Sequence, residues 1–211
     1  MRIPVIGVTG PIASGKTTVA RFIAGDRGAL VDCDALGARV LEAADVRKEL
    51  VAAFGAIILG PGAAVSRSKL ARVVFASDRN LERLNRIVRA RLKRIISDEV
   101  LKRRVGADYI VLDAVLLFQY KFRFKVDYAV LTRASLATRI TRVMRRDRIS
   151  RVEALARVER QRKLEDGWAR ADVVLATDGS LERVRSEAER IRNRFLAHSR
   201  AIWRNSRCRK S

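Results

Sequence analysis

Gly10-Pro11-Ile12-Ala13-Ser14-Gly15-Lys16-Thr17 is the stretch that decides the fold of this chain, because it fits the phosphate-loop pattern G-x-x-x-x-G-K-[ST]. An apolar run over residues 3–8 precedes the loop and predicts a buried strand, and residues 18–24 after it predict a helix. A phosphate loop needs a strand before it and a helix after it, so this context supports the match. The sequence therefore predicts a binding site for phosphate groups.

The residue types of this stretch suit the phosphates of a nucleotide. Backbone N–H groups of the loop and of the following helix N-terminus converge on phosphate oxygens. Lys16 is expected to place its charge at the β- and γ-phosphates, and the Thr17 hydroxyl is expected to hold Mg²⁺. The expected nucleotide-binding residues are Ala13, Ser14, Gly15, Lys16, Thr17 and Thr18.

Length and composition predict one domain with room for a small inserted subdomain. The chain has 211 residues, of which 48% are hydrophobic, which is enough to bury a sizeable core. Charge interrupts the longest apolar runs, as at Asp113, so no bilayer-spanning segment is expected. Cys33, Cys208 and the single histidine, His198, lack the spacing of a disulfide framework or a zinc site. We therefore expect a soluble, cytoplasmic protein.

Positive charge is in strong excess. The chain carries 45 Lys and Arg against 23 Asp and Glu, a formal net charge of +22. A field of this sign attracts polyanions, and both nucleotides with several phosphates and nucleic acid are candidates. A third interpretation is that many arginines simply lie on solvated helix faces, for example over residues 83–104. Charge alone does not separate the three.

The order of the apolar runs predicts an α/β fold. Five strand-like runs alternate with helical patterns, which is typical of a five-stranded parallel sheet with helices on both faces. The strand-like runs are residues 3–8, 29–31, 109–112, 128–131 and 173–175, and the helical patterns are residues 18–24, 35–41, 47–54, 69–75, 81–102, 136–146, 151–162 and 181–195.

Residues 1–197 are expected to form the domain, with helical material at about 41–104 inserted between the second and third strands. In a phosphotransferase, such an insertion is a natural place for the second substrate. The remaining segment, 198–211, carries arginines and a lysine but no acid, and we expect it to be a frayed basic tail.

Asp32 and Asp34 follow the second strand-like run. Since the carboxyl ends of parallel strands line the ligand crevice, both acids are expected near the phosphate loop. Because the two acids are expected to end this strand and side chains alternate along a strand, Asp32 and Asp34 are expected to point the same way. One of them could accept the proton of an attacking hydroxyl. The alternative is that Asp34 caps the helix that follows, and the two roles are compatible.

Asp113 ends the apolar strand over residues 109–112. A strand that ends in an acid resembles the Walker B arrangement, in which the Asp reaches Mg²⁺ directly or through water. The alternative is an ordinary turn or cap residue.

Four arginines, Arg139, Arg142, Arg145 and Arg146, lie on the helical pattern after the fourth strand. Arginines on a mobile helical hairpin can close over the γ-phosphate and stabilise the transferring charge. Arg142 and Arg146 are the candidates for this role, because residues four apart share one side of a helix. The alternative is a solvated basic face.

The chain resembles the dephospho-coenzyme A kinase family from Val5 to about Phe195. The motifs that carry the resemblance recur in the family's order and spacing. They are Gly7-Val8-Thr9-Gly10 with the phosphate loop, Val31-Asp32-Cys33-Asp34, Phe54-Gly55 with Ile58-Leu59, residues 70–75 with Leu84-Asn85, Leu112-Asp113-Ala114-Val115-Leu116-Leu117-Phe118, residues 142–147, residues 157–161 and Ala171-Asp172.

This resemblance implies a nucleoside-monophosphate-kinase-like fold and ATP-dependent phosphorylation of the ribose 3′-hydroxyl of dephospho-coenzyme A, giving coenzyme A and ADP. It implies that Asp34 is the base on the 3′-hydroxyl and that Lys16 and Thr17 serve ATP and Mg²⁺. Arg142 and Arg146 would lie in a lid at about 139–166. The helical insertion would hold the acceptor.

Two alternatives remain open on the sequence. The chain departs from the family pattern at Arg89-Ala90, Val115 and Gln119, which leaves room for a related small-molecule kinase with a shifted acceptor. A basic P-loop NTPase that binds nucleic acid is the other alternative, although aromatic residues make up only 6% of the chain and no zinc-finger or RNP-type pattern is present.

Overall fold

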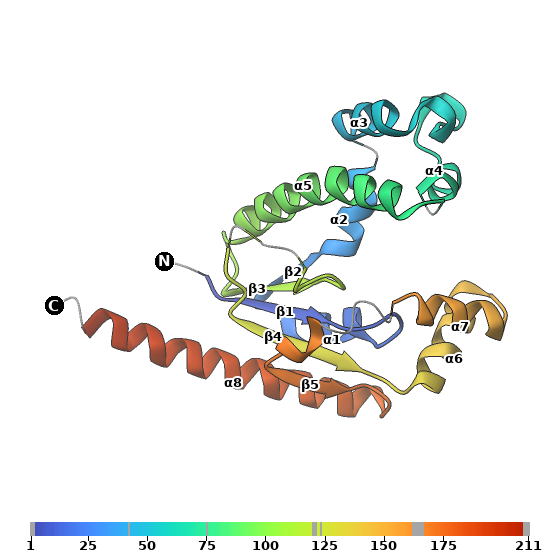
Figure 1. Ribbon diagram of the computed structural model, residues 1–211. Helices are drawn as coiled ribbons and strands as arrows, with labels where there is room; N and C mark the ends of the chain where they lie inside the picture. The colour runs from blue at the N-terminus through green and yellow to red at the C-terminus, as the bar shows by residue number, and fades with distance from the viewer. Residues whose placement is uncertain are drawn as a thin grey trace. The chain divides into compact units, whose positions relative to one another are not determined.

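Five parallel strands form a single sheet in the computed structural model of the chain (Figure 1). Their order across the sheet is β2-β3-β1-β4-β5, so the first strand lies in the middle and its neighbours come from distant parts of the chain. The expected five-stranded parallel sheet is thereby confirmed. The strands are β1 (Val5–Thr9), β2 (Gly28–Asp32), β3 (Tyr109–Asp113), β4 (Tyr128–Arg133) and β5 (Val173–Ala176).

The structure describes residues 3–41, 43–74, 76–119, 122, 124–161 and 167–208. The chain divides into two compact units. Unit 1 comprises Met1–Asp32, Val100–Gln119 and Arg123–Ser211, and contains the whole sheet. Unit 2 comprises Cys33–Glu99 and Tyr120–Phe122 and is helical.

The core of unit 1 lies between the sheet and two helices, α1 (Lys16–Ala24) and α8 (Leu181–Cys208). Strand side chains such as Ile6 and Val111 pack against apolar side chains of both helices, which recur at helical spacing. Tyr109 is also buried here, and its hydroxyl donates to the carbonyls of Ile23 and Ala24 at the end of α1. Burial raises the pKa of this hydroxyl, which keeps it a hydrogen-bond donor.

A helical hairpin follows β4 in unit 1. It consists of α6 (Leu136–Asp147) and α7 (Arg151–Glu159), which pack on each other (Figure 1). Ser135 caps α6 by accepting from the Thr138 N–H. Ser150 and Glu153 form a reciprocal capping box at the start of α7. These caps fix where each helix begins and so define the turn between them.

The described residues of unit 2 form four helices and two short 3₁₀ turns. Ion pairs and hydrogen bonds hold α5 to its neighbours, as Arg91 pairs with Asp45 at 3.3 Å and Arg83 donates to the Ala53 carbonyl at 3.0 Å. The elements are α2 (Cys33–Val40), α3 (Ala44–Phe54), η1 (Ala56–Ile58), η2 (Pro61–Ala63), α4 (Arg67–Val74) and α5 (Asp78–Arg103), whose last residues belong to unit 1.

Two expectations about local structure are wrong. β2 ends at Asp32 and α2 begins at Cys33, so Asp34 lies in the first turn of a helix. It is neither a strand residue on the same side as Asp32 nor the residue before the helix. The basic segment is also not frayed over residues 198–208, because α8 continues through Cys208. Residues 209–211 lie outside the described part of the chain.

Candidate active site

An ion pair and a hydrogen bond join the phosphate loop to the end of β3. The Lys16 ammonium pairs with the Asp113 carboxylate, and the Thr17 hydroxyl donates to the other oxygen of that carboxylate at 2.6 Å. The Asp113 side chain is only 1% exposed and that of Lys16 only 10%. β3 lies beside β1, with Asp113 in register with Val8, so the sheet brings this acid to the loop. The structure thus brings Lys16, Thr17 and Asp113 together, and their roles toward nucleotide and metal stay predictions.

The loop backbone adopts the left-handed conformations that an anion-binding turn requires. Gly15, directly before α1, has φ 80°, and Ala13 has φ 60°. Glycine accommodates this region without steric cost, whereas alanine does so only under strain. The first N–H groups of an α-helix have no partner within the helix, so the N–H groups of Thr17 and Thr18 in the first turn of α1 are oriented to donate to a ligand. The Ser14 N–H differs, because it donates to the Pro11 carbonyl at 3.1 Å.

Buried hydroxyl groups form hydrogen bonds that hold the loop in place. The Ser14 and Thr132 hydroxyls are hydrogen-bonded at 2.6 Å, and Thr132 donates in turn to the Thr9 carbonyl at 3.1 Å. Thr177, just after β5, donates its hydroxyl to the Ser14 carbonyl at 2.7 Å. All four threonine and serine side chains are buried, so these hydrogen bonds are shielded from water and hold the loop in one shape.

The four arginines of α6 have different environments. Arg139 is buried and donates to the Ile12 carbonyl at 3.1 Å. Arg142 donates to the Ala13 carbonyl at 3.1 Å, and to the hydroxyl and carbonyl oxygens of Thr177 at 3.2 and 2.6 Å. Arg145 is exposed. The structure therefore brings Arg139 and Arg142 to the phosphate loop, and α6 is not simply a solvated basic face.

Arg146 lies outside this group and pairs with an acid on its own helix. Its guanidinium contacts both oxygens of Asp147, at 2.7 and 3.0 Å, and Arg157 of α7 contacts the same carboxylate at 2.5 Å. The hydrogen bond from Arg146 lowers the pKa of Asp147 below its ordinary value. Asp147 therefore stays ionised near neutrality and links the two helices of the hairpin.

Asp34 is exposed and lies in the first turn of α2 in unit 2. Carboxylates in the first turn of a helix are favoured by the helix dipole. An exposed carboxylate is accessible to a substrate hydroxyl. Its role as the base stays a prediction.

The donor set at Thr17 and Asp113 suits magnesium. Mg²⁺ prefers hard oxygen ligands and keeps several waters, so it is bound through few protein groups. The Thr17 hydroxyl and the Asp113 carboxylate supply such oxygens and already lie 2.6 Å apart. The residues present therefore fit a magnesium ion.

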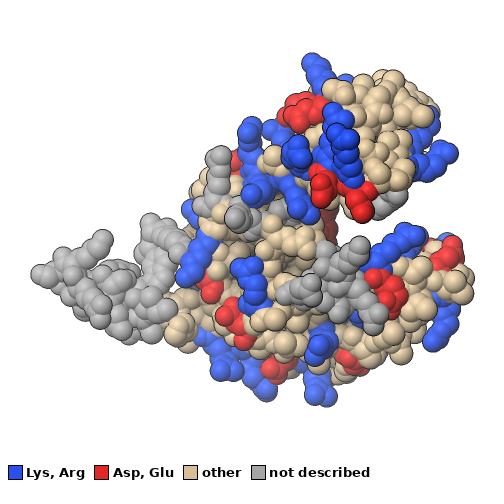
Figure 2. Space-filling view, in the orientation of Figure 1, with Lys and Arg blue, Asp and Glu red and all other residues tan. Residues whose placement is uncertain are grey.

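Charge on the visible face of the molecule is dispersed. Figure 2 shows Lys and Arg side chains interspersed with Asp and Glu, without one continuous basic strip.

Among the helices of the described residues, none combines the length and the apolar character that a bilayer crossing requires.

Sequence reasoning missed two residues at the loop, Gln161 and Thr177. Gln161 accepts from the Ile12 N–H at 2.6 Å, and Thr177 connects the Ser14 carbonyl with Arg142. Neither belongs to the phosphate-loop pattern, and both are distant from it in sequence. Only the register of β5 and the path of the hairpin could place them.

A phosphate loop after a central strand, with an acid at the end of the neighbouring strand and a basic hairpin beside the loop, defines a P-loop kinase. The chain matches the family model described as dephospho-CoA kinase over residues 4–183. It is 36% identical to the dephospho-CoA kinase of Arabidopsis thaliana, a match that covers 89% of this chain and 82% of that protein. It is 34% identical to that of Carboxydothermus hydrogenoformans, over 88% and 91%. The chain belongs to the dephospho-CoA kinase family.

Solved structures agree with this fold. A Thermus thermophilus protein, TT1252, is 34% identical and superposes with a TM-score of 0.75 over 94% of this chain and 98% of its own. The dephospho-CoA kinase of Campylobacter jejuni has a TM-score of 0.55 at 19% identity, covering 89% and 94%. Shikimate kinase from Acinetobacter baumannii has a TM-score of 0.52 at 17% identity, covering 93% and 94%. The last two show the P-loop kinase fold alone.

Proposed function

We propose that this chain transfers the γ-phosphoryl group of ATP to the ribose 3′-hydroxyl of dephospho-CoA, giving coenzyme A and ADP. The observation that carries the proposal is the buried Lys16–Thr17–Asp113 cluster at the phosphate loop, in a chain that belongs to the dephospho-CoA kinase family. The same cluster without the family would support only a nucleotide phosphotransferase of unspecified acceptor.

The phosphate loop positions ATP. The N–H groups of Ala13, Gly15 and the first turn of α1 donate to phosphate oxygens, and Lys16 balances the charge that develops on the transferring group. Because the Lys16 ammonium starts in contact with Asp113, binding ATP requires it to share its hydrogen bonds between the carboxylate and the phosphates. Asp113 thereby orients Lys16 as well as neutralising it.

Thr17 and Asp113 are the residues that would hold Mg²⁺, which supplies charge neutralisation at the β- and γ-phosphates when bound. Phosphoryl transfer from ATP to dephospho-CoA depends mainly on the positioning of the two substrates and on the stabilisation of charge. The cytoplasm is the compartment we propose.

Asp34 is proposed to accept the proton of the 3′-hydroxyl as the oxygen attacks the γ-phosphorus. Arg142 and Arg146 are proposed to act from the lid hairpin, at about 139–166, on the charge of the transferring group. The helical insertion is proposed to hold the acceptor. The family motif at residues 31–34 supports the role of Asp34, and the position of the hairpin beside the loop supports the roles of the two arginines.

The test is acceptor selectivity. ADP release from ATP and Mg²⁺ is measured with dephospho-CoA, with nucleoside monophosphates and with shikimate as acceptors. We expect rapid turnover only with dephospho-CoA. Preference for another acceptor would show a shifted specificity. Stimulation of ATP hydrolysis by RNA, without turnover on any acceptor, would favour the nucleic-acid-binding alternative.

A further inference from the structure

The phosphate loop is attached to the α6–α7 hairpin through its own backbone. The Ile12 N–H donates to the Gln161 side-chain carbonyl at 2.6 Å, and the Ile12 carbonyl accepts from Arg139 at 3.1 Å. The Ala13 carbonyl accepts from Arg142 at 3.1 Å. Three of the four backbone polar groups of Ile12 and Ala13 are thus bound by side chains of the hairpin and the turn after it.

Apolar contacts reinforce this attachment. Ile12 and Ala13 pack against the small core of the hairpin, which is formed by Ile140, Val143, Ala154 and Val158. The side chains of the loop and the backbone of the loop therefore contact the same hairpin. A movement of the hairpin relative to the sheet would act directly on residues 12 and 13.

Ala13 needs this support more than a glycine would. Its φ of 60° is in the left-handed region, which costs a residue with a Cβ free energy unless the surroundings hold it there. Its two backbone neighbours are Ile12, bound by Gln161 and Arg139, and Ser14, bound by Thr132 and Thr177. The strained residue lies between two fixed ones.

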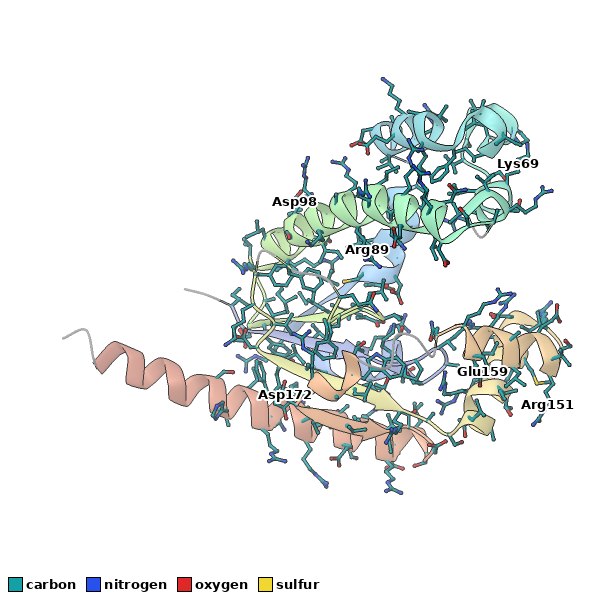
Figure 3. The ribbon with its side chains drawn as sticks, viewed as in Figure 1. Lys69, Arg89, Asp98, Arg151, Glu159 and Asp172 are labelled. Carbon is teal, nitrogen blue, oxygen red and sulfur yellow. The ribbon has the colours of Figure 1, made fainter. Side chains whose placement is uncertain are left out.

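Gln161 lies in the turn after α7 and binds the phosphate loop. α7 runs from Arg151, at the outer end of the hairpin, to Glu159, at the end nearer the sheet (Figure 3). Gln161 follows Glu159 by two residues and returns its side chain to the loop. Pro11 has no N–H, so the Ile12 N–H is the next amide donor of the loop after that of Gly10, and Gln161 binds it.

We propose that Gln161 is a positioning residue for the nucleotide: by binding the Ile12 N–H it holds Ala13 in its left-handed conformation and so keeps the loop amides from Ala13 onward aimed at the phosphates. Gln161 itself contacts no phosphate in this account. Because Gln161 lies directly after α7, the shape of the phosphate loop depends on where the hairpin lies. The inference rests on the proposed function only in that the loop binds ATP.

Two substitutions separate this role from a general contribution to folding. Gln161→Leu keeps the approximate size but removes the acceptor, whereas Gln161→Glu retains an oxygen that accepts from the Ile12 N–H. ATP affinity is measured by calorimetry without an acceptor substrate, and thermal unfolding is recorded for each protein. We expect Gln161→Leu to weaken ATP binding about tenfold, the loss of one well-formed hydrogen bond. Gln161→Glu should stay within about threefold of the parent chain.

Arg160→Leu is the matched control, since Arg160 is exposed and adjacent but has no side-chain hydrogen bond to the loop in the described part of the chain. It should leave ATP affinity unchanged. Equal loss from Arg160→Leu and Gln161→Leu, or loss from Gln161→Glu as large as from Gln161→Leu, would overturn the proposal.

The Ala13→Gly substitution tests whether Gln161 acts through the conformation of residue 13. Glycine adopts a φ of 60° without strain, so the loop should depend less on Gln161 when residue 13 is glycine. We expect the effect of Gln161→Leu on ATP affinity to shrink severalfold in the Ala13→Gly chain. An undiminished effect would contradict the proposed link through Ala13. Failure of the parent chain to phosphorylate dephospho-CoA would contradict the proposed function but leave this binding test intact.

Discussion

Lys16 and Asp113 form an ion pair that is almost completely removed from water, with side-chain exposures of 10% and 1%. The Asp113 carboxylate also accepts from Thr17, so one acid organises both residues that the phosphate-loop pattern requires. A buried pair of this kind is costly to break from one side, because the remaining charge is left without compensation. The catalytic site and the stability of unit 1 are therefore coupled at this carboxylate.

Lys16→Ala should abolish turnover and also destabilise the protein, by about 3–5 kcal/mol, because Asp113 then stays buried without its partner. Lys16→Arg should keep most of the stability, since it retains the charge, yet turn over poorly because a guanidinium cannot occupy the same place at the phosphates. Urea unfolding and initial rates check both. Near-normal turnover in Lys16→Ala would refute the kinase mechanism.

Asp34→Asn should lower kcat while leaving the melting temperature almost unchanged. The amide keeps the size and much of the hydrogen-bonding capacity of the carboxylate but does not accept a proton from the acceptor hydroxyl. Steady-state kinetics with dephospho-CoA, together with calorimetric melting, measure the two effects. If the melting temperature falls while kcat is unchanged, Asp34 stabilises the helix and does not take part in the reaction.

Arg146→Ala should reduce kcat on the order of a hundredfold, with a smaller change in the dissociation constant of ATP, because charge that acts on the transferring group is felt mainly in the transition state. Arg145→Ala is the control on the same helix, as Arg145 is exposed. Small and equal effects of both variants would show that this end of α6 is only a solvated basic surface.

Asp147 should give the hairpin a pH-dependent contribution to stability. Hydrogen bonding to Arg146 lowers the pKa of Asp147 in the folded state, so its contribution is present above the ordinary aspartate value and is lost as pH falls through the lowered pKa. The unfolding free energy of Asp147→Asn should lie below that of the parent by about 1 kcal/mol or less at neutral pH.

The measurement for Asp147 is urea unfolding of both proteins at a series of pH values. The difference between them should be constant from about pH 8 to about pH 5 and shrink below about pH 4. A difference that grows on acidification would have the wrong sign for a lowered pKa.

The sequence predicts the sheet and the phosphate loop well because both depend on local patterns. Buried parallel strands are continuous apolar runs, and a loop of fixed glycine spacing needs no partner to be recognised. Asp113 was found for the same reason, as an acid directly after such a run. The end of β2 was harder to place, because Val31-Asp32-Cys33-Asp34 reads equally as a strand end or as the start of a helix, and only the pairing of Asp32 with Asp113 separates the two.

The contacts around the loop depend on packing and could not be predicted from local patterns. Arg139 and Arg142 are spaced as a solvated face would be, but the hairpin turns them toward Ile12 and Ala13. Gln161 and Thr177 reach the loop across more than a hundred residues of sequence. Residues 157–161 belong to the motifs that carry the family resemblance, but that resemblance does not assign Gln161 to the loop backbone.

Identification of the reaction product is the most direct test of phosphoryl transfer to the ribose 3′-hydroxyl. Dephospho-CoA, ATP and Mg²⁺ are incubated with the protein, and the product is examined by phosphorus and carbon nuclear magnetic resonance. We expect one new phosphomonoester, coupled to the ribose 3′ carbon, formed in equal amount to ADP and formed more slowly by the Lys16→Arg and Asp34→Asn proteins. ADP formed without that phosphomonoester, or a phosphate on any other position, would contradict it.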